Sequence, residues 1–83
     1  MNTVPIEPAE QVLNLLGQLT TIPRADIKPT DNLRADLGLD SVAAMELVSM
    51  LAEQLQIEIE LEDAMQIETV GQVIELVRER TRG

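Results

Sequence analysis

The sequence predicts an all-α fold: a small four-helix bundle with three longer helices, one short helix III and a long loop between helices I and II. Three stretches carry apolar residues at the i, i+3, i+4 spacing that places them on one helix face. Only one stretch has a strand-like pattern, and an isolated strand is unstable. The 83 residues are enough for one small domain, which we expect to span residues 1–83.

The first helix is predicted over about residues 8–20, after a frayed start at residues 1–7. Pro8 suits the first position of a helix, where the N–H group that it lacks would have no intrahelical partner. The following apolar residues repeat at i, i+3, i+4 and i+7, so they share one face. They are Val12, Leu15, Leu16 and Leu19.

A long loop is predicted over about residues 21–39, because this stretch combines Pro23, Pro29 and Gly38 with several Asp and Thr residues. A loop of this length in a small domain is usually functional or held by packing. Residues 30–32 can begin a short helical turn. The apolar residues expected to cover the open end of the bundle are Ile22, Ile27, Leu33 and Leu37.

The second helix is predicted from Ser41 to about Leu55. Gly38 can adopt backbone angles that other residues avoid. Asp40 or Ser41 can accept a hydrogen bond from the free N–H groups of the first helical turn. The core candidates on one side of this helix are Ala44, Leu47, Val48, Leu51 and Leu55.

Residues 56–63 alternate apolar and acidic side chains, a pattern that alone is typical of a strand. Because no second strand signal exists to pair with it, we expect an extended connector with Ile57, Ile59 and Leu61 directed inward. A short helix is then predicted from about Leu61 to Gln66.

The last helix has the clearest signals. Thr69 and Gln72 have the spacing of a capping box. Arg78, Arg80 and Arg82 lie at its C-terminal end, where positive charge interacts favourably with the helix dipole. The apolar stripe between these two signals consists of Val70, Val73, Ile74 and Val77.

The composition excludes several functions. The 15 acidic and 6 basic residues give a formal net charge of -9, which opposes binding to nucleic acid or anionic membranes and favours a partner with a basic patch. The absence of Cys excludes disulfides and thiol chemistry. The first residues lack a basic start and a long apolar run, so no signal peptide or membrane span is predicted. We expect a cytoplasmic monomer.

Ser41 is the most informative polar residue, because it lies where the loop is expected to become a helix. A phosphoryl group attached to an exposed hydroxyl there would meet free N–H donors and the positive end of the helix dipole. The chain contains no His, so Ser41 has no obvious general base to activate it as a nucleophile. This favours modification by another enzyme, although an Asp-Ser pair can also serve only as a helix cap.

Acidic residues dominate the stretch between Arg34 and Arg78, which contains no Lys or Arg. They either form a solvated surface or steer the chain toward basic docking sites. A calcium loop at residues 36–40 is rejected, because the ligand spacing and final Glu of an EF-hand are missing, and no metal site is predicted. The acids nearest to Ser41 in sequence are Asp36, Asp40, Glu46 and Glu53.

Residues 32–42 read Asn-Leu-Arg-Ala-Asp-Leu-Gly-Leu-Asp-Ser-Val, and Met45-Glu46-Leu47 follow closely. This region resembles the phosphopantetheine attachment region of acyl carrier proteins, whose pattern is roughly an acidic residue, Leu-Gly-x-Asp-Ser-Leu, an apolar residue and Glu-Leu. Val42 stands where Leu is commoner. The resemblance extends over about residues 8–80 and, with the starting Met and the single-domain length, implies a free-standing carrier.

The resemblance implies that a phosphopantetheinyl transferase, using coenzyme A and Mg²⁺, joins 4′-phosphopantetheine to Ser41, beside Asp40. The thiol of this arm then carries an acyl group as a thioester, and the protein itself is not an enzyme. Partners with basic docking patches, of the acyl-transferring, ketosynthase or ligase type, would receive the acyl group. The implied docking residues are Asp36, Val42, Met45, Glu46 and Glu53.

Two of these docking residues have other interpretations. Val42 and Met45 are apolar and lie away from the centre of the core stripe. They can pack against the loop, form a contact surface for partner enzymes, or line a pocket for the tethered chain, for which Met is well suited.

The pathway stays open, because this chain departs from the pattern of fatty-acid carriers. Ala or Gln occupies several positions of the second helix where those carriers often have acids. Polyketide or specialised lipid synthesis is therefore as well supported as fatty acid synthesis. The positions concerned are Ala43, Ala44, Ala52 and Gln54.

Three other functions are kept as alternatives. A peptidyl or aminoacyl carrier is the nearest, although Leu39-Asp40 before the serine favours acyl cargo. An interaction module could share the fold while Ser41 is never modified. An acid-rich enzyme could use Asp36 and Asp40 as paired carboxylates, but the chain has no His or aromatic residue with which to build a pocket.

Overall fold

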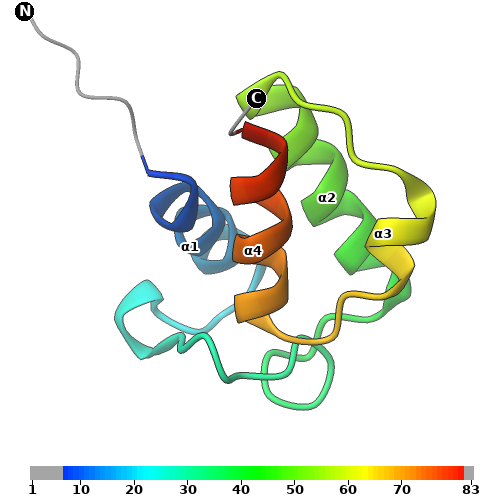
Figure 1. The fold of residues 1–83 in the computed structure, drawn as a ribbon. Coiled ribbons are helices and arrows are strands. Elements are labelled where there is room, and N and C mark those ends of the chain that lie inside the picture. The colour runs from blue at the N-terminus through cyan, green and yellow to red at the C-terminus, as the bar shows by residue number, and fades with distance from the viewer. Residues whose placement is uncertain (1–6, 82–83) are drawn as a thin grey trace, which may run out of the picture.

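The computed structural model of the chain describes residues 7–81 (Figure 1). These residues form α1 (Pro8–Leu19), the 3₁₀ helix η1 (Arg24–Asp26), α2 (Ser41–Leu55), α3 (Leu61–Met65) and α4 (Val70–Thr81). Within them the only β-type pairing is an isolated bridge between Asn32 and Thr69. The predicted all-α fold is confirmed. The predicted frayed segment lies outside the described residues except for Glu7, and so does Arg82.

The predicted bounds of α2 match the observed ones, and the predicted ends of α1 and α3 each lie one residue too late. Thr20 has extended backbone angles, and its hydroxyl donates to the carbonyl of Leu16 at 2.8 Å, so α1 stops at Leu19. Helix α3 stops at Met65, and Gln66 is its C-cap. The 3₁₀ helix directly after Pro23 was not predicted, because three residues are too few to carry a periodic pattern.

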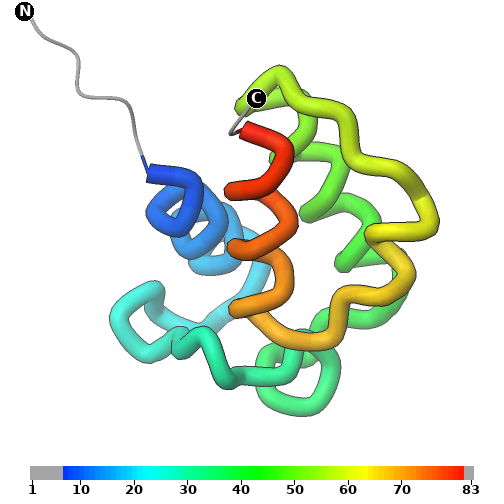
Figure 2. The backbone as a smooth tube through the Cα atoms, in the orientation of Figure 1, coloured from blue at the N-terminus to red at the C-terminus, as the bar shows by residue number. Residues whose placement is uncertain are grey.

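Apolar side chains hold the helices together. Helix α1 packs against α4 and α2, while α2 also contacts α3, and Figure 2 shows the backbone path that brings them together. No polar or charged side chain of residues 7–81 is buried. The side chains with almost no exposed surface come from the predicted stripes: Val12, Leu15, Leu16, Leu47, Leu51, Val70, Val73 and Val77.

The long loop is held by packing, as predicted, with one additional residue. Ile27, Leu33 and Leu37 are buried, and Ile22 is partly buried against the core. Leu39, which was not among the predicted apolar residues of the loop, is also buried. These side chains fix the loop on the bundle, so the segment leading to Ser41 has a defined path.

A hydrogen-bonded turn precedes α2. The Asn32 side-chain oxygen accepts from the N–H groups of Arg34 at 2.9 Å and Ala35 at 2.8 Å. The Asp36 carboxylate accepts from the N–H of Asn32 at 2.7 Å. Gly38 closes the turn with a φ of 74° and donates its N–H to the carbonyl of Arg34 at 3.1 Å.

The start of α4 is tied to this loop. Thr69 and Gln72 form the predicted capping box, with reciprocal hydrogen bonds of 3.2 and 3.0 Å. The N–H of Val70 donates to the carbonyl of Asp31 at 3.0 Å, and the N–H of Gly71 donates to that of Pro29 at 2.8 Å. Loop carbonyls therefore satisfy N–H groups that a helix start would otherwise leave free.

The prediction that Leu61 points inward is wrong. Its side chain is 60% exposed, whereas Ile57 and Ile59 are partly buried. Helix α3 begins at Leu61, so the extended connector ends at Glu60. The alternation of side-chain directions that holds along an extended segment therefore does not apply to Leu61. The buried residue of α3 is Ala64.

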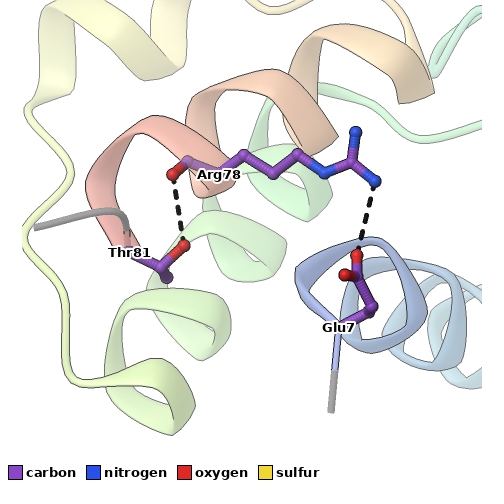
Figure 3. A network of polar contacts seen from close by, with 3 residues as sticks. All are labelled: Glu7, Arg78 and Thr81. Atoms are coloured by element: carbon purple, nitrogen blue, oxygen red, sulfur yellow. Dashed lines mark hydrogen bonds and ion pairs between the residues drawn. The ribbon is translucent and has the colours of Figure 1, made fainter. Parts of the chain in front are cut away.

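Ion pairs connect the elements at the surface. Arg78 reaches Glu7 at 3.4 Å, and the Thr81 hydroxyl donates to the carbonyl of Arg78 at 3.2 Å (Figure 3). Arg80 pairs with Asp63, which links α4 to α3. Exposed pairs of this kind each contribute about 0–1 kcal/mol, so burial of apolar surface dominates the stability. Across residues 7–81, no helix is long and apolar enough to cross a membrane.

Candidate functional site

Ser41 is the first residue of α2, and its side chain is exposed. The helix cap is Asp40: its carboxylate accepts from the N–H of Ala43 at 2.8 Å, and its carbonyl accepts from the N–H of Ala44 at 2.9 Å. The Ser41 hydroxyl makes no hydrogen bond within residues 7–81. Of the two caps that the sequence allowed, Asp40 is the one used, and the hydroxyl of Ser41 stays accessible.

The helix start also provides a favourable electrostatic setting. The backbone N–H groups of Ser41 and Val42 have no acceptor within the described part of the chain. They lie at the positive end of the helix dipole. An anionic group bonded to the Ser41 oxygen would therefore be stabilised by the α2 N-terminus.

A groove of about 350 Å³ adjoins Ser41. Its lining comes from the loop, from the first turn of α2, from α3 and from the segment between α3 and α4. Buried apolar side chains and exposed polar ones contribute to the same groove. The lining residues are Asn32, Leu33, Arg34, Leu39, Asp40, Ser41, Ala44, Met65, Ile67 and Glu68.

Three of the predicted docking residues lie on one exposed stripe of α2. Val42, Glu46 and Glu53 are separated by four and seven positions, which is the spacing of one helix face, and all three are exposed. Val42 is 73% exposed, so it does not pack closely against the loop. Met45 is partly buried beside this stripe. Neither Val42 nor Met45 lines the groove next to Ser41.

Asp36 differs from the other docking candidates, because it lies in the turn before α2 and not on the helix. Its carboxylate accepts from the N–H of Asn32. Asp36 is exposed, yet this hydrogen bond gives it a structural contribution that sequence reasoning did not assign.

Sequence reasoning missed several exposed apolar or groove-lining residues. Leu61 and Met65 are exposed apolar side chains of α3 and are separated by four positions, so they share a face. That spacing could have identified them once α3 was placed. Asn32, Arg34 and Glu68 line the groove, but no local pattern connects Glu68 with Ser41.

Comparisons with known proteins agree with this geometry. Residues 10–77 match the family described as phosphopantetheine attachment site. An acyl carrier protein of Saccharopolyspora erythraea is 39% identical over 67 residues, which cover 81% of this chain and 70% of the relative. The family match at residues 10–77 includes most of α1, the loop, α2, α3 and most of α4. The chain therefore belongs to the acyl carrier protein family, whose members hold a covalently attached 4′-phosphopantetheine group.

Proposed function

We propose that Ser41 is the attachment point of the 4′-phosphopantetheine group and that the chain presents acyl groups held on it to partner enzymes. The observation that carries the proposal is the exposed Ser41 hydroxyl, free of hydrogen bonds within residues 7–81, in the first turn of α2. The only other serine of the chain, Ser49, lies in the middle of the same helix and not at its start.

The surroundings of Ser41 suit the chemistry of this group. Its phosphate would bond to the Ser41 oxygen near the unoccupied N–H groups of the helix start. The amides of the arm can exchange hydrogen bonds with polar groove residues such as Asn32, and Leu33 and Leu39 provide apolar contact. When bound, the group supplies a terminal thiol on which an acyl chain is held as a thioester.

The chain acts in this proposal as a substrate of other enzymes and catalyses nothing itself. The sequence contains no His, and no side chain within residues 7–81 forms a hydrogen bond with the Ser41 hydroxyl. Activation of a serine nucleophile needs a base in hydrogen-bond contact. In this proposal Ser41 is therefore modified by another enzyme and is not a nucleophile.

Partner enzymes are proposed to dock on α2 and α3. The stripe of Val42, Glu46 and Glu53 provides both apolar and acidic contacts, and α3, which contacts α2, carries the exposed apolar side chains Leu61 and Met65. Basic patches on acyl-transferring, ketosynthase or ligase enzymes would be steered by the net charge of -9. Small interfaces of this kind exchange quickly, as successive steps of fatty acid, polyketide or specialised lipid synthesis require.

The test is loading by a broad-specificity phosphopantetheinyl transferase with coenzyme A and Mg²⁺, followed by mass spectrometry of the intact chain and its peptides. We expect one added arm, on the peptide that contains Ser41. Ser41→Ala should abolish the addition. Ser49→Ala is the matched control, because Ser49 is an exposed serine of the same helix, and this variant should load like the wild type.

Loading of Ser41→Ala, or modification of Ser49, would show that attachment does not depend on Ser41. A wild-type chain that stays unmodified with every transferase tested would favour the interaction module. Circular dichroism of each variant excludes loss of the fold as the cause.

A further inference from the structure

The groove beside Ser41 has an uneven charge. Two carboxylates, those of Asp40 and Glu68, line it, and Arg34 is its only basic residue. No other Lys or Arg lies between Arg34 and Arg78 in the sequence. Any further negative charge in the groove would meet one positive side chain and two negative ones.

Arg34 differs from the other arginines that the structure describes. Arg24, Arg78 and Arg80 each form an ion pair, with Glu10, Glu7 and Asp63 respectively. The Arg34 guanidinium has no carboxylate within ion-pair distance among residues 7–81. Its side chain is exposed, so the guanidinium is available to an added anion.

The backbone of Arg34 is nevertheless well fixed. Its N–H donates to the Asn32 side chain at 2.9 Å, and its carbonyl accepts from Gly38 at 3.1 Å. Leu33, the preceding residue, is buried and donates its N–H to the carbonyl of Glu68 at 2.9 Å. The turn therefore holds Arg34 at the groove, and only its side chain has to be ordered by a ligand.

We propose that Arg34 is a positioning residue for the arm: its guanidinium binds the phosphodiester attached to Ser41 and keeps the first part of the arm along the groove. This inference rests on the proposed attachment at Ser41. A guanidinium matches phosphate oxygens with two parallel N–H donors, which gives direction as well as charge neutralisation. The Asp40 carboxylate competes less for Arg34, because it already accepts from the N–H of Ala43.

The experiment compares unloaded and loaded forms of the wild type, Arg34→Gln, Arg34→Lys and Lys28→Gln. Lys28 is the matched control: it is an exposed basic residue of the same loop but does not line the groove. Mass spectrometry first establishes that each sample carries the arm. Urea unfolding at low salt then gives the unfolding equilibrium constant of every form.

Comparing each variant with and without the arm removes any purely structural effect of the substitution. For each variant, the ratio of the unfolding equilibrium constants of the loaded and unloaded forms measures how the arm affects stability. In Arg34→Gln, we expect this ratio to be about threefold higher than in the wild type, as for the loss of an exposed charge-assisted contact. Arg34→Lys should recover part of this difference, and Lys28→Gln should behave like the wild type. The difference should disappear at high salt.

Nuclear magnetic resonance supplies a second measurement. On loading, the Nε–H signal of Arg34 should shift in the wild type, while the corresponding signal of Arg24 should not. The inference would be overturned if loading changed the unfolding equilibrium constant equally in the wild type and Arg34→Gln and the Arg34 signal did not move. The proposal that the arm is attached to Ser41 would not be affected by that result. Slower loading of Arg34→Gln without these effects would assign Arg34 to transferase docking, which also overturns it.

Discussion

The interface of α1, α2 and α4 is held by apolar burial, whereas the segment from Asn32 to Ser41 combines apolar burial with local polar contacts. The interface consists of aliphatic side chains with almost no exposed surface, such as Leu16 and Leu51. In the segment before α2, the side-chain oxygens of Asn32, Asp36 and Asp40 also accept hydrogen bonds from backbone N–H groups at accessible positions. Burial of apolar surface therefore holds both regions together, and in the segment before α2 local polar contacts add to the buried Leu33, Leu37 and Leu39 in setting where Ser41 is presented.

The largest effect is expected in the apolar interface. Leu51 is fully buried, so Leu51→Ala should lower the free energy of unfolding by about 2–5 kcal/mol through lost burial and the cavity left behind. Val42→Ala is the control, because Val42 is 73% exposed on the same helix and should change stability by at most about 0.5 kcal/mol. Urea unfolding of both variants checks this, and similar losses would contradict the contrast between core and surface.

The second effect tests the polar segment. Asn32→Ala removes the oxygen that accepts from Arg34 and Ala35, which should cost about 1–2 kcal/mol. Asn14→Ala is the control, since Asn14 is exposed in α1 and its side chain makes no hydrogen bond within residues 7–81. In Asn32→Ala, the rate of amide hydrogen exchange should rise chiefly at residues 33–38. Uniform exchange increases across α1 and α4 would show that the segment and the core are a single unit.

The third effect concerns two helix glycines in different surroundings. A Cβ at Gly71 would lie 3.1 Å from the carbonyl oxygen of Pro29, which accepts from the N–H of Gly71 itself. Gly71→Ala should therefore strain the connection between the loop and α4 and lower stability by about 1 kcal/mol. Gly17→Ala meets only ordinary contacts, with Arg24 Cβ at 3.5 Å, and should raise stability by about 0.5–1 kcal/mol. Thermal unfolding of both variants tests whether their melting temperatures move in opposite directions.

The smallest effect separates the two neighbours at the start of α2. Asp40→Ala loses the cap on Ala43 and should cost about 1 kcal/mol, whereas Ser41→Ala loses no hydrogen bond formed within residues 7–81 and should stay within about 0.5 kcal/mol. Urea unfolding of the unloaded variants checks the order. A larger loss for Ser41→Ala would mean that the serine itself contributes to the cap.

Most of the helices could be predicted because their signals are local. The stripes of α1, α2 and α4 and the Thr69–Gln72 capping box depend on residues within about three turns of each other. The carrier motif around Ser41 is local in the same sense. The burial of Leu39 was missed, because a residue between Gly38 and Asp40 belongs to no periodic stripe.

The sequence by itself determined the helical elements, the acidic charge, the lack of a histidine base and the serine at a helix start. Tertiary structure decided what surrounds that serine. The pairing of Asn32 with Thr69 and the hydrogen bond from Leu33 to Glu68 bring Arg34, Met65 and Glu68 to one groove with Ser41. These contacts join segments far apart in the chain, so they form only when burial of the apolar helix faces brings those segments together.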